Sequence, residues 1–236
     1  MNRLITTILV TFLTLYGSKP SYADSSKKSS IFNINRLQAR YTENNALSFT
    51  QSVFIRSSVS QLFLLEVFEH TEAYDDKEAF NLLEINTGGA LFDDNQPYRI
   101  GWVARAQNAS HSSTVYSLGM QFNLSNLESI KNLARKYKLN TFVQVFPFKN
   151  NDSFGDYDLL HYYSLRLYGK LSVRGTNAWY HFNNEKNYVR ALADFIYPLN
   201  RHFDVYTRYV YQNRDEVRAG ELGSEWSIGF RYNFKW

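Results

Sequence analysis

The feature that most constrains this chain is an alternation of apolar and polar residues with a period of two. The final stretch shows it most clearly. Residues 226–236 place Trp, Ile, Phe, Tyr, Phe and Trp at every second position, with polar residues or glycine between them. Successive side chains of a β-strand point to opposite faces of the sheet, so this period predicts strands rather than helices.

The same period recurs along the chain in about twelve runs, separated by clusters of Asn, Asp, Ser and Pro that mark turns. Most runs are about ten residues long, the length of a strand that crosses a bilayer at a tilt of about 45°. We expect strands at residues 32–41, 47–56, 61–70, 78–87, 98–107, 113–124, 138–148, 159–169, 171–182, 188–197, 203–212 and 223–236.

Two architectures fit many alternating strands. A soluble β-sandwich has strands of about five or six residues, whereas an outer-membrane barrel has longer strands whose apolar faces meet lipid and whose polar faces meet the lumen. The long runs, the 18 Tyr, 18 Phe and 4 Trp residues, and the Arg, Gln, Asn and Ser opposite the apolar faces favour the barrel. We therefore predict an all-β fold, an antiparallel up-and-down transmembrane barrel of about twelve strands.

The N-terminus has the layout of a secretory signal peptide. A basic segment at residues 1–3 precedes an apolar run at 4–15, and Ser21 and Ala23 stand three residues and one residue before a cleavage point. The apolar run is shorter than the roughly 20 residues that span a bilayer, so we prefer cleavage to an uncleaved anchor. We divide the chain into a signal peptide at 1–23, a flexible periplasmic tail at 24–30 and a barrel at 31–236.

Composition narrows the function classes. The chain has no Cys, so disulfides, thiolate metal sites and Cys nucleophiles are excluded. No phosphate-binding glycine loop, HExxH or EF-hand pattern is present, and we expect neither a cofactor nor a metal. Cleavage after Ala23 removes two of the 26 basic residues, which leaves 24 against 22 acidic ones. With so small a surplus, we expect no nucleic-acid partner.

Residues 125–137 break the period of two. Ser125 followed by Glu128 matches a capping box, and apolar residues then recur at helical spacing at positions 127, 130, 133, 134 and 137. Basic residues gather towards the end of this segment, where a helix dipole favours cations. We expect one short periplasmic helix near 125–137, either packed on the barrel rim or acting as a gate.

If the aromatic-rich faces meet lipid, the opposite faces line the lumen. Guanidinium groups in a confined pore attract carboxylates and phosphates, and tyrosine rings offer stacking surfaces for sugars or bases. The carboxylates on these faces are fewer: Glu66, Asp194, Asp204 and Glu225. The alternative is that the arginines pair with acids and fill the lumen. The predicted pore-lining residues are Arg99, Arg105, Arg166, Arg190, Arg208, Arg231, Tyr162 and Tyr188.

The end of the chain resembles the C-terminal signal of bacterial outer-membrane barrels, an alternating final strand that ends in an aromatic residue. Phe230, Tyr232, Phe234 and Trp236 match that pattern, although the last residue is usually Phe in the family. The resemblance implies recognition by the outer-membrane barrel assembly machinery, contact with outer-membrane lipid and a location in the bacterial outer membrane.

Chain length, strand number and a basic lumen also resemble the small monomeric porins, either the oligogalacturonate and sialic-acid channels or the nucleoside-specific channels. Residues 202–234, "HFDVYTRYVYQNRDEVRAGELGSEWSIGFRYNF", look like the last strand pair of the acidic-sugar porins. The resemblance implies a monomeric channel without enzymatic activity, through which small anionic, sugar-like or nucleoside-like solutes diffuse.

Two rival functions remain. A barrel with a blocked lumen would be a structural element or a receptor. Outer-membrane phospholipase A is also a twelve-stranded barrel, and residues 197–211 resemble its penultimate hairpin, but its His-x-Ser-Asn-Gly catalytic segment is not matched. Asn108 stands where the base should be, and His111 is adjacent to Ser110, so the two face opposite sides of a strand. The other histidines have no motif partner and are expected to be isolated polar residues.

Overall fold

The computed structural model describes residues 31–43, 46–57, 62–73, 80–91, 100–110, 113–125, 127–150, 156–182, 187–213 and 223–234. The predicted signal peptide at 1–23 and the predicted tail at 24–30 lie outside the described residues, and so do Arg99 and Trp236.

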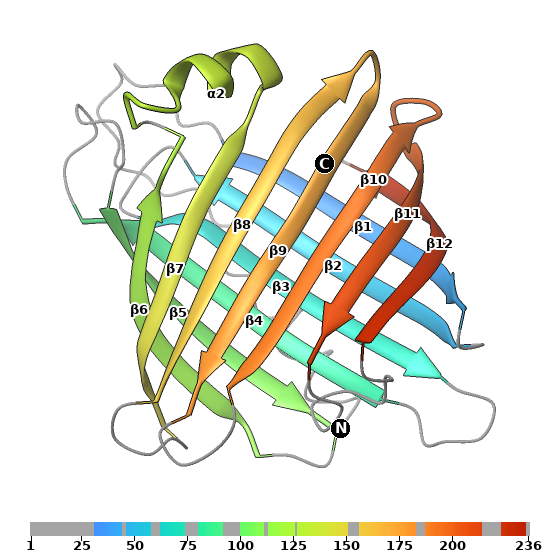
Figure 1. Cartoon of the computed structure of the whole chain (residues 1–236). Helices are drawn as coiled ribbons and strands as arrows, with labels where there is room; N and C mark the ends of the chain where they lie inside the picture. Colours follow the sequence, from blue (N-terminus) through green and yellow to red (C-terminus); the bar gives the residue numbers. More distant parts are fainter. Residues whose placement is uncertain are drawn as a thin grey trace, which may run out of the picture. The chain divides into compact units, whose positions relative to one another are not determined.

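Within these ranges, twelve antiparallel strands form one closed barrel (Figure 1). The last strand closes the ring by pairing with the first, so that Gln38 of β1 lies opposite Arg231 of β12. The predicted fold class is confirmed, and each strand end lies within three residues of its predicted position. The strands are β1 (Ile31–Thr42), β2 (Leu47–Ser57), β3 (Leu62–Ala73), β4 (Phe80–Ala90), β5 (Ile100–Ala109), β6 (Val115–Asn123), β7 (Asn140–Lys149), β8 (Tyr157–Tyr168), β9 (Leu171–His181), β10 (Tyr188–Pro198), β11 (Phe203–Gln212) and β12 (Gly223–Phe234).

The two faces of the barrel wall differ in the way that the alternation predicts. On β12, Ser227 and Arg231 face the interior and are buried, whereas Ile228 and Phe230 face outward and are 57% and 60% exposed. On β5, Arg105 is buried in the same way as Arg231. On these strands large apolar side chains face outward and polar side chains face inward, which is the reverse of a soluble β-sandwich.

The two ends of the barrel differ. At the end that we call the turn end, β8 joins β9 through Gly169 and Lys170, β10 joins β11 through residues 199–202, and β1 begins beside the end of β12. Gly169 has a φ of 54°, a left-handed conformation that glycine adopts without steric cost. The opposite end, where β1 ends and β2 begins, is the loop end.

Exposed aromatic side chains gather near both ends of the outer face. Exposed aliphatic side chains such as Leu37, Leu118 and Ile228 share the outer face with them. Membrane barrels carry aromatic girdles of this kind at their two lipid interfaces. These exposed aromatics include Tyr197, Phe203 and Tyr232 towards the turn end, and Tyr41, Tyr116, Phe148, Trp179, Tyr211 and Trp226 towards the loop end; Phe49, Tyr168, Phe195 and Phe230 are exposed as well.

The helix in the β6–β7 connection is shorter than predicted. The observed helix is α2 (Lys131–Tyr137), at the top of Figure 1. No side chain caps it. The capping box that was expected from Ser125 and Glu128 does not form. The Ser125 hydroxyl oxygen instead accepts a hydrogen bond from the Thr141 N–H at 2.7 Å, and Glu128 pairs with Lys131 at 3.0 Å. Because the hydroxyl is already engaged, the predicted start at 125 is wrong.

Two tyrosine rings pack over glycines of other strands. On the outer face, Tyr163 of β8 lies over Gly175 of β9, and its hydroxyl donates to the Leu192 carbonyl of β10 at 3.3 Å. A Cβ atom at position 175 would lie 2.3 Å from the tyrosine oxygen, so only glycine leaves room for the ring. On the inner face, Tyr206 lies against Gly229 of β12 in a similar way.

Candidate functional site

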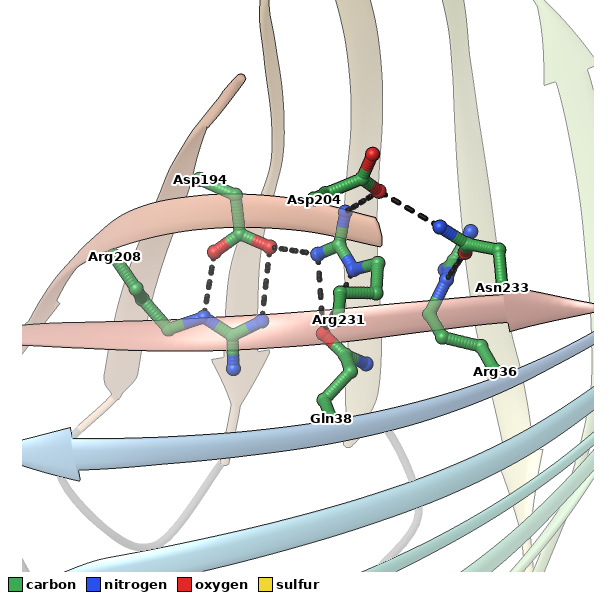
Figure 2. A network of polar contacts seen from close by, with 7 residues as sticks. All are labelled: Arg36, Gln38, Asp194, Asp204, Arg208, Arg231 and Asn233. Carbon is green, nitrogen blue, oxygen red and sulfur yellow. Dashed lines mark hydrogen bonds and ion pairs between the residues drawn. The ribbon is translucent and has the colours of Figure 1, made fainter. Parts of the chain in front are cut away.

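Among the residues that the structure describes, the interior holds two networks of charged side chains. The registers of β9 to β12 assemble the first, which we call the turn-end network. Asp194 lies opposite Arg208, and Asp204 lies opposite Arg231. Because Asp204 is the second residue of β11, the network lies near the turn end. Its members, shown in Figure 2, are Arg36, Gln38, Asp194, Asp204, Arg208, Arg231 and Asn233.

Asp194 is the centre of the turn-end network. Its Oδ1 accepts a hydrogen bond from Arg208 Nε at 2.6 Å, and its Oδ2 accepts one from Arg208 Nη2 at 2.9 Å. The same Oδ2 accepts a third from Arg231 Nη2 at 3.1 Å. Arg231 also donates to the Gln38 side chain and lies 3.9 Å from Asp204. One carboxylate therefore orients two guanidinium groups through charge-assisted hydrogen bonds.

Arg174 of β9 faces the same space without a carboxylate of its own. It lies directly opposite Asp194 in the β9–β10 ladder, but Arg208 and Arg231 engage both oxygens of that aspartate. In the part of the chain that the structure describes, Arg174 makes no hydrogen bond or ion pair; Asp194 and Asp204 are near enough to attract its charge, and Arg36 and Arg208 are near enough to repel it. Arg174 and the described members of the turn-end network together have a formal surplus of two positive charges, four arginines (Arg36, Arg174, Arg208 and Arg231) against two aspartates (Asp194 and Asp204).

The second network, which we call the loop-end network, contains Glu84, Arg105, Gln107, Lys149 and Asp158. Arg105 of β5 forms an ion pair with Asp158 of β8, although β6 and β7 separate these strands in the sheet. Lys149 Nζ lies 2.8 Å from the other oxygen of Asp158, and Glu84 accepts a hydrogen bond from the Gln107 side chain. Two cations balance two carboxylates, so this network has no charge surplus.

An apolar cluster packs beside the loop-end network on the inner faces of β5, β7, β8 and β9. It contains Val103, Phe146, Leu160 and Ala178, all of them buried. The Arg105 guanidinium lies 4.4 Å from the centroid of the Phe146 ring, where the negative face of the ring attracts a cation. This wall of the interior is therefore occupied by packed side chains.

The arginines predicted to line the pore lie in different surroundings. Arg208 and Arg231 belong to the turn-end network, and Arg105 belongs to the loop-end network. Arg190 shares the inner face of β10 with Asp194, nearer the loop end, whereas Arg166 is exposed near the turn end of β8. The remaining one, Arg99, is outside the described residues. A pore-lining role for each stays a prediction.

The two predicted tyrosines face inward and already stack on neighbours. The Tyr162 ring stacks on Phe142 with centroids 4.8 Å apart, and the Tyr188 ring stacks on Tyr180 at 5.0 Å. The Tyr188 hydroxyl also donates to the Gln212 side chain at 3.3 Å. One face of each ring is thus covered before any solute arrives.

The residues of the predicted assembly signal follow the outer face of β12. Phe230 and Tyr232 are exposed there, and Phe234 is the last residue of the strand. Trp236 lies outside the described residues. Recognition of this stretch by the assembly machinery stays a prediction.

Sequence reasoning missed Arg174 and Asp158. Residues 171–182 carry polar and apolar side chains on both faces, for example Asn177 beside Trp179 on the outer face, so the alternation did not assign a face to Arg174. Asp158 lies one residue before the strand that the sequence predicts at 159–169. An aromatic residue at 157 followed by a polar one at 158 continues the alternation, and this signal in the sequence could have extended the predicted strand to its observed start.

One histidine expected to be isolated has two partners. His161 Nε2 lies 2.8 Å from Thr141 Oγ1, and its Nδ1 lies 3.2 Å from Asn177 Nδ2. Leu160 and Ala178 point inward in the same strands, so this cluster lies on the outer face of β7, β8 and β9. His161 is therefore part of a hydrogen-bonded polar cluster, because the registers of three strands bring these groups together.

The segment around Asn108 and Ser110 forms no nucleophile–base pair in the described ranges. The Ser110 hydroxyl oxygen accepts a hydrogen bond from the Asn81 N–H at 2.7 Å, and no described histidine bonds to it. Among the described residues, no group of three or more His, Asp and Glu is placed to hold a metal ion. No helix in the same ranges is long and apolar enough to span a membrane.

Comparisons with known proteins bear on the fold. No protein-family model matches the sequence, and no curated protein does either. Solved structures do match. The KdgM porin has a TM-score of 0.51 at 12% identity, with 85% of this chain and 99% of that chain covered. The NanC porin has a TM-score of 0.56 at 13% identity, with 84% and 98% covered.

This chain has the fold of these small porins. Another structure, described as KdgM porin in complex with disordered oligogalacturonate, has a TM-score of 0.53 at 10% identity, with 85% of this chain and 99% of that chain covered. Nearly the whole length of each porin is matched, so the similarity includes the size of the barrel as well as its topology. It confirms the resemblance to small porins that the sequence pattern suggested.

Proposed function

We propose that this protein is an outer-membrane channel through which small anionic solutes diffuse. The observation that carries this proposal is the surplus of arginine over aspartate among the described side chains at the turn end, where Arg174 lies opposite Asp194 but is hydrogen-bonded to no carboxylate. Guanidinium groups that outnumber the carboxylates around them attract anionic carboxylates and phosphates, and they do so more strongly in a confined space than in bulk water.

The outer surface supports a place in a membrane. It carries many exposed large apolar side chains, and several exposed aromatic residues lie towards each end of the barrel. Both ends of an even-stranded bacterial barrel lie in the periplasm, so the turn end would face the periplasm and the loop end the exterior. The predicted signal peptide at 1–23 agrees with export. The partners of the barrel would be outer-membrane lipid and the barrel assembly machinery.

Acidic sugars are the anions to test first. A porin of the same fold is described in complex with oligogalacturonate, whose carboxylates are groups that the turn-end arginines would attract. Flat, neutral solutes such as nucleosides rank lower, because Tyr162 and Tyr188 already stack on other aromatic rings.

A barrel with a blocked lumen is the second candidate. One observation favours it: the Arg105–Asp158 ion pair crosses two intervening strands beside the packed cluster of Val103, Phe146, Leu160 and Ala178. Such a filled wall narrows the interior. A structural or receptor role would follow if no continuous path remains.

Conductance separates these candidates. The refolded protein is inserted into planar bilayers, and the reversal potential is measured in a potassium chloride gradient. We expect conductance with anion preference, and we expect Arg174→Gln to weaken the preference. Arg201→Gln, which removes one exposed charge in the β10–β11 turn, is the matched control and should leave it unchanged. Absence of conductance would support the blocked barrel, and cation preference would overturn the anion channel.

A further inference from the structure

The connection between β6 and β7 leaves apolar side chains uncovered. Leu127 is 41% exposed and Leu133 is 51% exposed. The helix α2 contacts β8, yet none of its residues is buried. A helix that packs on its own domain normally buries one apolar stripe, so the described part of the barrel does not supply the surface that these leucines fit.

The same short segment is strongly basic. Residues 127–138 contain Lys131, Arg135, Lys136 and Lys138 but a single acid, Glu128. Both carboxylate oxygens of Glu128 are bonded by Lys131, at 3.1 and 3.0 Å. The segment therefore has a formal surplus of three positive charges beside two exposed leucines, the combination found in helices that lie in a membrane interface.

Charge decides among the possible occupants of this surface. A second copy of the chain would present the same cationic segment and repel it. The mouth of the barrel at the turn end is also unfavourable, because the turn-end network inside it has its own surplus of positive charge. An anionic lipid surface is complementary to the segment, and it lies beside the turn end wherever the apolar outer face meets a bilayer.

We infer that residues 127–138 anchor the turn end to anionic phospholipid headgroups. Leu127 and Leu133 enter the boundary between headgroups and acyl chains, while the four cations contact lipid phosphates. This inference rests on the proposed membrane location. It assigns α2 to the lipid surface rather than to the channel mouth, so α2 is neither a plug nor a gate.

The absence of cysteine allows a direct test on the full chain. Ser129→Cys, at an exposed position, carries an environment-sensitive dye, and the protein is folded into vesicles of phosphatidylcholine alone or mixed with phosphatidylglycerol. We expect the dye to report a drier environment with phosphatidylglycerol. Each cation near an anionic surface contributes about 1 kcal/mol, or roughly five-fold in affinity. Replacing all four cations by Gln should reduce the preference for phosphatidylglycerol at least ten-fold.

A charge-preserving variant is the matched control. Lys131→Arg, Arg135→Lys, Lys136→Arg and Lys138→Arg together should keep the lipid preference. Leu127→Ser with Leu133→Ser should weaken the dye response in both vesicle types. A dye that stays in water in phosphatidylglycerol vesicles, or a preference that survives loss of all four cations, would overturn the anchor.

Conductance distinguishes this inference from the proposed function. We expect the four-Gln variant to conduct with unchanged selectivity. If it opens more often or conducts differently, α2 acts at the mouth and the anchor is wrong. If the wild-type protein does not conduct while the dye still follows phosphatidylglycerol, the channel proposal fails and the anchor stands.

Discussion

Asp194 of β10 and Arg208 of β11 form a two-point ion pair on the inner face, with hydrogen bonds of 2.6 and 2.9 Å. The pair fixes one strand against the next, and with Arg231 it also occupies both oxygens of the carboxylate. Arg174, the other neighbour of Asp194, forms no hydrogen bond with it as a consequence. The contacts of Asp194 therefore distinguish Arg208 and Arg231, which it holds in place, from Arg174, which we propose attracts the solute.

Asp194→Asn should separate these two effects. The amide keeps the shape but leaves Arg208 and Arg231 without their shared anion, and loss of one partner of a buried ion pair costs about 3 kcal/mol. We expect easier unfolding in urea together with a reversal potential shifted further towards anions. Asp204→Asn is the comparison: its carboxylate lies 3.9 Å from Arg231, so its effect on unfolding should be smaller. Equal effects would contradict a central role for Asp194.

Arg105→Gln and Arg174→Gln should have opposite profiles. Arg105 is paired with a buried carboxylate and stacks on Phe146, so its loss should lower the free energy of unfolding by about 2 kcal/mol or more. Arg174 has no such contact in the described residues, and its loss should leave unfolding nearly unchanged while it reduces anion preference. Urea titrations and reversal potentials on both variants check this. Strong destabilisation by Arg174→Gln would show a structural contact for that side chain.

Gly175→Ala should destabilise the barrel far more than Gly169→Ala. A Cβ at 175 would lie 2.2 Å from the Leu192 carbonyl oxygen and 2.3 Å from the Tyr163 hydroxyl oxygen, so strands must shift and we expect a loss of about 3 kcal/mol. A Cβ at 169 meets nothing within 4 Å, and its positive φ alone costs about 1 kcal/mol. Refolding yield in detergent and urea midpoints would compare the two. Similar urea midpoints for the two variants would show that the Tyr163 ring can pack on β9 without a glycine at position 175.

The outward cluster around His161 predicts a non-additive result. His161→Leu leaves Thr141 and Asn177 without their partner on an apolar surface, and unsatisfied polar groups cost about 1 to 3 kcal/mol. Thr141→Val, His161→Leu and Asn177→Leu together remove every group of the cluster, so the triple variant should be at least as stable in lipid as the wild type. If the triple variant is less stable than His161→Leu alone, the hydrogen bonds of the cluster contribute net stability beyond pairing polar groups that would otherwise be unsatisfied.

The sequence predicts the strands well because a two-faced wall imposes the alternation on nearly every residue of β12 or β5. The start of α2 was not predictable, since Ser125 had a competing partner in Thr141 that only the folded β6–β7 connection supplies. The Arg105–Asp158 pair was equally hidden. It depends on the registers of four strands, including an irregularity between β6 and β7, and no local pattern specifies such a contact.

The ladder between β1 and β12 joins Gln38 to Arg231, residues 193 positions apart. Until β12 is in place, β1 and β11 each present a row of unpaired amide and carbonyl groups, and such edges recruit other strands and promote aggregation. Any partly assembled barrel therefore exposes strand edges, and only closure of the ring pairs them. A chain that ended before residue 223 would leave the edges of β1 and β11 unpaired, so we expect it to aggregate rather than to form a less stable barrel.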